Sequence, residues 1–111
     1  VQVGTAFLLC DEATTSAVHR QALSGESDKV TAITNVFSGR PARGIVNRAI
    51  RELGPISSAA PAFPQAATAI TALRQQAEAR GSGDFSPLWC GAKSSGCEAI
   101  SAAALMAKLM D

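Results

Sequence analysis

The stretch VQVGTAFLL, residues 1–9, decides the fold class that we predict for this 111-residue chain. Its apolar residues alternate little with polar ones, which is typical of a parallel strand that is covered on both faces. Gly4 interrupts the run, and a glycine inside a strand marks a place where another group approaches the backbone closely. We therefore predict a buried strand over residues 1–9.

Two helices and a short extended segment are predicted in the residues that follow. Residues 14–23 have a helical pattern, and Thr14–Ser16 offer side chains that can cap its start. After a loop, residues 30–37 alternate loosely, which indicates a short strand or an extended connection. The next helix begins at Pro41 and carries its apolar residues on one face, at Ala42, Ile45, Val46, Ala49, Ile50 and Leu53.

The second half of the chain predicts two more helices. Residues 55–64 are an irregular connector, residues 65–80 a helix with a stripe rich in alanine, and residues 81–97 a long loop. The last helix has Ser101 as its N-terminal cap. We expect its buried side to consist of Leu105, Met106, Leu109 and Met110.

A single strand cannot satisfy its own backbone hydrogen-bonding groups. One strand, or two, with four helices behind it is typical of the tail of an α/β protein whose other strands lie upstream. The chain starts without a Met, which hints that it begins inside a longer protein or was processed. We expect the 111-residue piece itself to be mostly α-helical.

Composition argues against two classes of partner. Ten Lys and Arg against nine Asp and Glu give a net charge of +1, whereas a nucleic-acid-binding module needs a concentrated basic surface. No window reaches the roughly 18 apolar residues that span a bilayer. We therefore expect neither a nucleic acid nor a membrane as partner.

The three cysteines do not form a recognisable metal motif. Cys10, Cys90 and Cys97 include no CxxC pair, and the single His19 lies far from the last two. A Cys90–Cys97 disulfide fits the spacing, but we favour reduced thiols in a cytoplasmic protein. We interpret His19 as a surface or helix-packing residue.

Gly4 and Thr5 have the clearest chemistry in the chain. The glycine exposes a backbone N–H with no Cβ in the way, and the threonine adds a second N–H and a hydroxyl. Such a pair suits a phosphate oxygen. The alternative interpretation is a strand glycine that relieves packing.

Two arginines offer a second candidate for anion binding. Arg40 and Arg43 could clamp an anion, but arginine in a first helical turn opposes the helix dipole. We favour the alternative that Arg43 and Asn47, four apart on one helix face, tie this helix to a loop.

Three stretches together resemble one enzyme family, the FMN-dependent nitronate monooxygenases. Residues 1–8, VQVGTAFL, resemble the GVQxGTxF strand of that family, and residues 38–47, SGRPARGIVN, resemble its SGRxARxxxN segment. Residues 87–91, PLWCG, resemble its PLWAGQ turn, from which Cys90 and Ala92–Lys93 depart. The three stretches follow the order of the family with roughly its spacing.

The resemblance implies that the chain is the C-terminal third of a (β/α)8 TIM barrel, an α/β fold. Residues 1–111 would belong to one FMN-binding barrel domain. In it, residues 1–9 are the last barrel strand, residues 14–54 are helices and a loop, and residues 55–111 are a C-terminal helical extension. The resemblance assigns the FMN phosphate to Gln2, Val3, Gly4 and Thr5. It places the catalytic histidine upstream of residue 1.

The implied activity is the oxidation of an alkyl nitronate by FMN and O2 to a carbonyl compound and nitrite. The alternatives are a flavin-dependent enoyl-ACP reductase, an NAD(P)H:quinone reductase of the same barrel group, and an inactive helical fragment. We expect the isolated chain to be inactive and to bind FMN weakly or not at all. For the enzyme, a homo-oligomer is one option.

Overall fold

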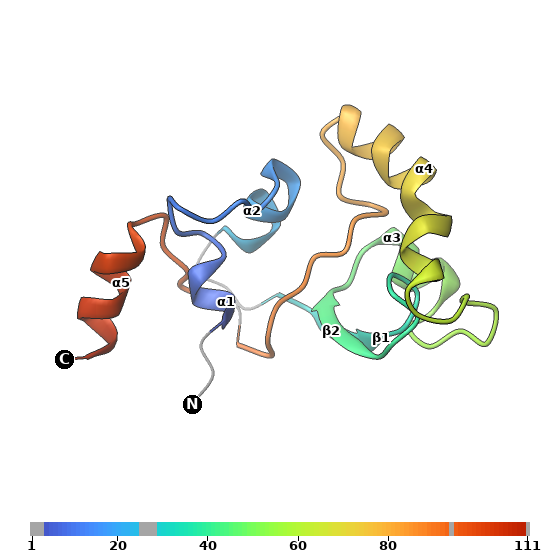
Figure 1. Cartoon of the computed structure of the whole chain (residues 1–111), viewed down its shortest axis with the longest axis horizontal. Helices are drawn as coiled ribbons and strands as arrows, with labels where there is room; N and C mark the ends of the chain where they lie inside the picture. Colours follow the sequence, from blue (N-terminus) through green and yellow to red (C-terminus); the bar gives the residue numbers. More distant parts are fainter. Residues whose placement is uncertain (1–3, 25–28, 94, 111) are drawn as a thin grey trace.

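The computed structural model describes residues 4–24, 29–93 and 95–110, and within these ranges it holds five helices and one two-stranded sheet (Figure 1). The molecule is elongated, with a longest extent of 46 Å. Its radius of gyration is 14.5 Å, against about 13 Å for a compact domain of this length. This shape reflects two groups of elements along the long axis.

We call residues 4–24, 90–93 and 95–110 the α1 lobe, and residues 29–89 the sheet lobe (Figure 1). Each lobe has its own hydrophobic core. The larger core lies in the sheet lobe and buries Val36, Phe37, Ala49, Ile50 and Ile70. The smaller core lies in the α1 lobe and buries Leu9, Leu23 and Cys90.

The start of the chain differs from the prediction. Residues 1–3 lie outside the described residues, and helix α1, Gly4–Phe7, occupies part of the predicted strand. The Leu8 N–H donates to the Thr5 carbonyl and the Cys10 N–H to the Phe7 carbonyl, both at 3.1 Å. A short apolar run does not separate a buried strand from a helical segment. The predicted strand is therefore wrong from Gly4 onward.

The next two elements agree better with the sequence pattern. Helix α2, Ala17–Leu23, begins after Ser16, whose Oγ accepts a hydrogen bond from the His19 N–H. The prediction of this helix is confirmed, with a later start than expected. Strand β1, Thr31–Thr34, lies within residues 30–37 and confirms the strand interpretation there.

The helix predicted from Pro41 to Leu53 is two elements. Strand β2, Ala42–Ile45, pairs antiparallel with β1, in a register that places Ala42 opposite Thr34. Helix α3, Arg48–Leu53, starts only after Asn47, whose side-chain oxygen accepts from the Ile50 N–H. Its end at Gly54 is as predicted.

Long-range partners explain why β2 is a strand despite its helical apolar spacing. On the edge that faces away from β1, the Ile45 N–H donates to the Leu88 carbonyl at 2.8 Å, and the Cys90 N–H donates to the Arg43 carbonyl. Gly44 permits this approach, because a Cβ there would lie 3.1 Å from the Leu88 oxygen. The backbone of β2 is thus paired on both edges, which offsets the local preference for helix.

The two C-terminal helices form where they were predicted. Helix α4, Gln65–Ala79, follows the irregular connector of residues 55–64. Helix α5, Ala102–Leu109, is capped by Ser101, whose Oγ accepts from the Ala104 N–H.

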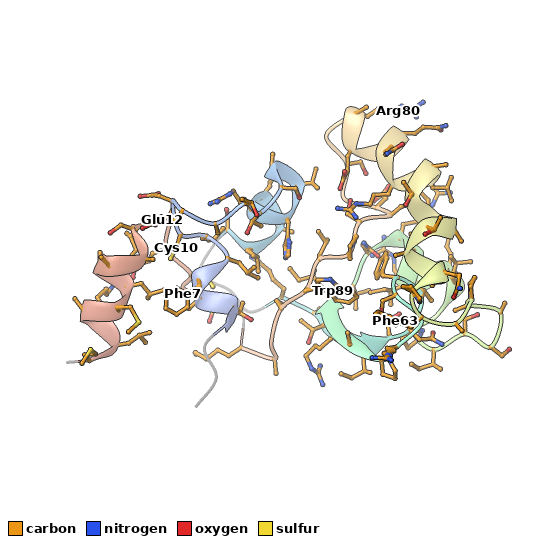
Figure 2. The ribbon with its side chains drawn as sticks, viewed as in Figure 1. Phe7, Cys10, Glu12, Phe63, Arg80 and Trp89 are labelled. Carbon is orange, nitrogen blue, oxygen red and sulfur yellow. The ribbon has the colours of Figure 1, made fainter. Side chains whose placement is uncertain are left out.

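The burial predicted for α5 is wrong in this chain. Met106 and Leu109 are about half exposed, and Met110 is 80% exposed. The helix is held at its N-terminal end, where the Glu12 carboxylate accepts from the Ala102 N–H at 2.8 Å (Figure 2). Leu105 is partly buried, but Met106, Leu109 and Met110 are left exposed by the described residues.

The described residues are therefore mixed in secondary structure rather than mostly helical, and the two strands that they hold are antiparallel. Trp89 links the two lobes (Figure 2). Its ring meets the Phe37 ring edge to face at 5.7 Å in the larger core. Its carbonyl accepts a hydrogen bond from the His19 side chain on α2.

Candidate functional site

The residues around Gly4 and Thr5 enclose a cavity of about 370 Å³ in the α1 lobe. One wall is α1 itself. The other is the segment after Trp89, more than eighty residues away in sequence. The lining consists of Gly4, Thr5, Ala6, Gly91, Ala92, Lys93, Ser95, Gly96 and Cys97.

Thr5 joins the two walls of this cavity. Its side-chain oxygen accepts a hydrogen bond from the Gly91 N–H at 2.7 Å, and its carbonyl oxygen lies 3.9 Å from the Cys97 sulfur. A hydroxyl can accept and donate at the same time. The Thr5 hydroxyl can therefore hold the segment after Trp89 and still donate its proton into the cavity.

The chemistry of the lining favours a negatively charged group. A Cβ built on Gly4 would meet nothing within 4 Å, so the backbone is uncovered at this point. Among the lining residues that the structure describes, Lys93 carries the one ionic side chain. Backbone amides, a hydroxyl and an ammonium are the donors that bind phosphate or carboxylate oxygens.

The cysteines beside the cavity are reduced thiols. Burial raises the pKa of the Cys90 thiol and of the Cys97 thiol. Both side chains are therefore neutral near pH 7 and add no negative charge to the cavity. The reduced state agrees with the interpretation favoured from the sequence. Within the described part of the chain, no three His, Cys, Asp or Glu side chains gather into a possible metal site.

The predicted cofactor residues are only partly described. The structure places Gly4 and Thr5 together on the cavity wall, whereas Gln2 and Val3 lie outside the described residues. The sequence pointed to the Gly-Thr pair but not to the second wall. The sequence did contain a feature that could have indicated the second wall. Gly91 and Gly96 flank Lys93 in a loop that is too long to be a simple connection.

Arg40 and Arg43 have separate partners in the sheet lobe and do not form an anion clamp. The Arg40 guanidinium lies 4.2 Å from the centre of the Phe63 ring. Arg43 is on β2 and donates to the Thr31 hydroxyl, so the predicted helix face shared with Asn47 is wrong. The Asn47 tie itself is confirmed, because its side-chain amide donates to the Gly83 and Ser86 carbonyls, both at 2.8 Å.

Two residues of α2 make polar ties, His19 to the sheet lobe and Arg20 within the α1 lobe. The buried His19 ring donates through Nε2 to the Trp89 carbonyl at 2.9 Å, which is a helix-packing role. Arg20 is a residue that the sequence pattern did not single out. Its guanidinium donates to four carbonyls of the turn before α2, those of Leu9, Cys10, Ala13 and Thr15.

A second hollow in the molecule has a different chemistry. It lies in the sheet lobe beside α4 and has a volume of about 210 Å³. Its lining is almost entirely apolar and includes Leu53, Pro61, Ile70 and Leu73. With no ionic group in its lining, this groove does not suit an anion. None of the helices in the described ranges has the length and apolar character needed to cross a bilayer.

Comparisons with known proteins give one consistent family. All of residues 1–111 match the family model described as nitronate monooxygenase. The chain is 38% identical over 112 residues to the nitronate monooxygenase of Pseudomonas aeruginosa. This match covers all of this chain and 32% of that protein. It is also 37% identical over 91 residues to a probable nitronate monooxygenase of Staphylococcus saprophyticus. That match covers 82% of this chain and 26% of the relative.

A solved structure supports the same relation. The nitroalkane oxidase from Streptomyces ansochromogenes superposes with a TM-score of 0.85 at 36% sequence identity. The match covers 98% of this chain and 31% of the other. The chain thus spans about a third or less of the length of the relatives that it matches.

Proposed function

This chain belongs to the nitronate monooxygenase family of oxidoreductases, and we propose that it is the C-terminal part of an FMN-dependent enzyme that oxidises alkyl nitronates with O2. The family match over the whole chain supports the proposal, together with a solved relative of which the match covers 31%. In that arrangement the last strand of a (β/α)8 barrel ends before α1, which begins at Gly4. Helices α2 and α3, with β1 and β2 between them, then follow, and residues 55–111 form a C-terminal extension.

The observation that carries the proposal is the cavity at Gly4 and Thr5. We assign the flavin phosphate to the Gly4 and Thr5 backbone amides and the Thr5 hydroxyl, with Gln2 and Val3 next to them. The donors of the lining fit a phosphate group, because its oxygens accept hydrogen bonds and carry negative charge. The chemistry that bound FMN supplies is the oxidation of the nitronate with O2 to a carbonyl compound and nitrite.

The residues of this chain would bind and orient the cofactor rather than move protons in the reaction. Thr5 holds the second cavity wall through Gly91 and so fixes the space that a phosphate can enter. His19 is committed to the Trp89 carbonyl, and we place the catalytic base in the part of the enzyme that precedes residue 1. We also propose a cytoplasmic location, a compartment in which free thiols such as those of the three cysteines persist.

The test uses the complete gene product that contains this chain. Titration with FMN should quench the flavin fluorescence at one equivalent, and an alkyl nitronate should then drive oxygen consumption with release of nitrite. A purified protein that takes up no FMN, or that holds FMN and leaves nitronates unchanged, would contradict the proposal. Oxidation of NADH with an enoyl thioester or a quinone, in place of nitronate turnover, would support the reductase alternatives instead.

The isolated 111-residue chain provides a second test. It should bind FMN weakly or not at all, because it contributes the phosphate end of the site and lacks the rest of the barrel. Equilibrium dialysis of the chain with FMN measures this directly. Stoichiometric, tight binding by the chain alone would show that the cofactor site is complete within these residues.

A further inference from the structure

The second wall of the cavity carries the positive charge of Lys93, which has no role yet in the site formed by Gly4 and Thr5. Lys93 lies two residues after Gly91, whose N–H is bound to the Thr5 side chain at 2.7 Å. This hydrogen bond fixes the base of the segment that carries Lys93 against α1. Lys93 also lies in the part of the turn where the chain departs from the PLWAGQ pattern that it resembles.

The surroundings of Lys93 leave the positive charge of the cavity uncompensated. The lining includes no Asp or Glu among its described residues. Glu98, the nearest acidic residue along the chain, forms an ion pair with Lys108 of α5. Burial raises the pKa of the Cys97 thiol, and the positive charge of Lys29 opposes that rise. A second lysine therefore adds positive potential at the wall that carries Lys93.

We propose that Lys93 is a phosphate-binding residue, whose ammonium acts with the Gly4 and Thr5 amides on the phosphate of the cofactor. The inference rests on the proposed function, since it names a further residue of the same site. Lysine suits this role as a point charge on a flexible stem, which can approach a phosphate from the second wall. The attraction acts only on the phosphorylated form of the flavin.

The experiment compares two flavins that differ in this one group. The complete gene product, freed of cofactor, is titrated with FMN and with riboflavin, which has no phosphate. Lys93→Ala should weaken FMN binding about tenfold, equivalent to about 1.4 kcal/mol, and leave riboflavin binding within twofold. Lys93→Arg should keep most of the FMN affinity because it keeps the charge.

Arg80→Ala is the matched control, since it removes an exposed positive charge after α4 that does not line the cavity. It should leave both affinities unchanged. The FMN affinity of the unaltered protein should also fall more steeply with salt than that of the Lys93→Ala variant. Equal losses for FMN and riboflavin, or no loss for either, would overturn the role of Lys93.

A calorimetric titration with inorganic phosphate separates this inference from the proposed function. If the unaltered protein takes up no flavin, the proposed function fails. The role of Lys93 then still stands if the protein binds inorganic phosphate and Lys93→Ala loses that binding. Absence of phosphate binding in both proteins would overturn it.

Discussion

The sheet lobe has more residues than the α1 lobe, and the two lobes are held together differently. The sheet lobe has backbone pairing on both edges of β2 and a core of five buried residues. The α1 lobe has a core of three, and its other ties are polar side chains that reach carbonyls. The cavity lies in the α1 lobe, so the proposed binding site is placed where local packing is thinner. Binding sites are commonly drawn from such regions.

The largest effect that tests this comparison comes from two leucines of the α1 lobe. Leu23 is 0% exposed and Leu109 is 46% exposed. Leu23→Ala should lower the free energy of unfolding by about 3 kcal/mol, because it leaves a hole in the small core. Leu109→Ala should change it by less than about 0.5 kcal/mol. Urea denaturation of the 111-residue chain, followed by Trp89 fluorescence, measures both.

A comparable loss for the two leucine variants would mean that α5 is covered in solution. Self-association of the chain is one way to cover it, and sedimentation of the unaltered chain would then show a dimer or a larger species. In that case the contrast between the lobes would hold only for the monomer.

The next effect concerns the polar tie of the sheet lobe. Asn47→Ala removes the cap of α3 and two hydrogen bonds to the loop after α4. We expect it to lower the free energy of unfolding by about 2 kcal/mol. Asn47→Ser keeps an oxygen for the cap and loses the two loop bonds, so it should recover part of the loss. Identical losses in the two variants would show that the cap contributes nothing measurable.

The corresponding tie in the α1 lobe is Arg20. Arg20→Lys keeps the charge but cannot reach four carbonyls at once, because an ammonium lacks the planar fork of the guanidinium. The free energy of unfolding should fall by about 1 kcal/mol, and the turn before α2 should exchange its amide hydrogens faster. If lysine proves as good as arginine, the positive charge rather than the hydrogen bonds holds this turn.

The smallest effect is a dependence of stability on pH. Burial raises the pKa of the Cys90 thiol in the folded chain. The buried, neutral Cys90 thiol therefore makes its full contribution to stability below the pKa of an unfolded cysteine, about 8.5. That contribution is lost as the pH rises through the higher pKa of the folded chain. Denaturation curves between pH 7 and pH 10 should show a steeper alkaline decline for the unaltered chain than for Cys90→Ala. Parallel declines would contradict this.

Local signals in the sequence were sufficient for part of the fold. Ser101 was predicted as a cap, and Ser16 as one of three candidates, because such side chains act on backbone groups within three residues. The helix over residues 65–80 followed from the spacing of its apolar residues. Both kinds of signal depend on neighbours in sequence, which the residue order itself fixes.

The errors arose where partners lie far apart in the chain. Residues 42–45 have helical spacing but form a strand, because β1 and the Leu88 carbonyl pair with their backbone. Residues 4–7 were assigned to a strand, because an unalternating apolar run fits a buried strand as well as a helix. The apolar side of α5 was expected to be buried, but burial depends on a neighbour that the pattern of α5 alone cannot supply.

By itself, the sequence determined the family, the helix caps and the Gly-Thr pair, because motifs and local hydrogen bonds are written in adjacent residues. Only the tertiary structure brought Gly91 and Lys93 to Thr5 and made a cavity from them. The physical reason is that a cavity needs two walls. Their approach here depends on a hydrogen bond across 86 residues, which no local pattern encodes.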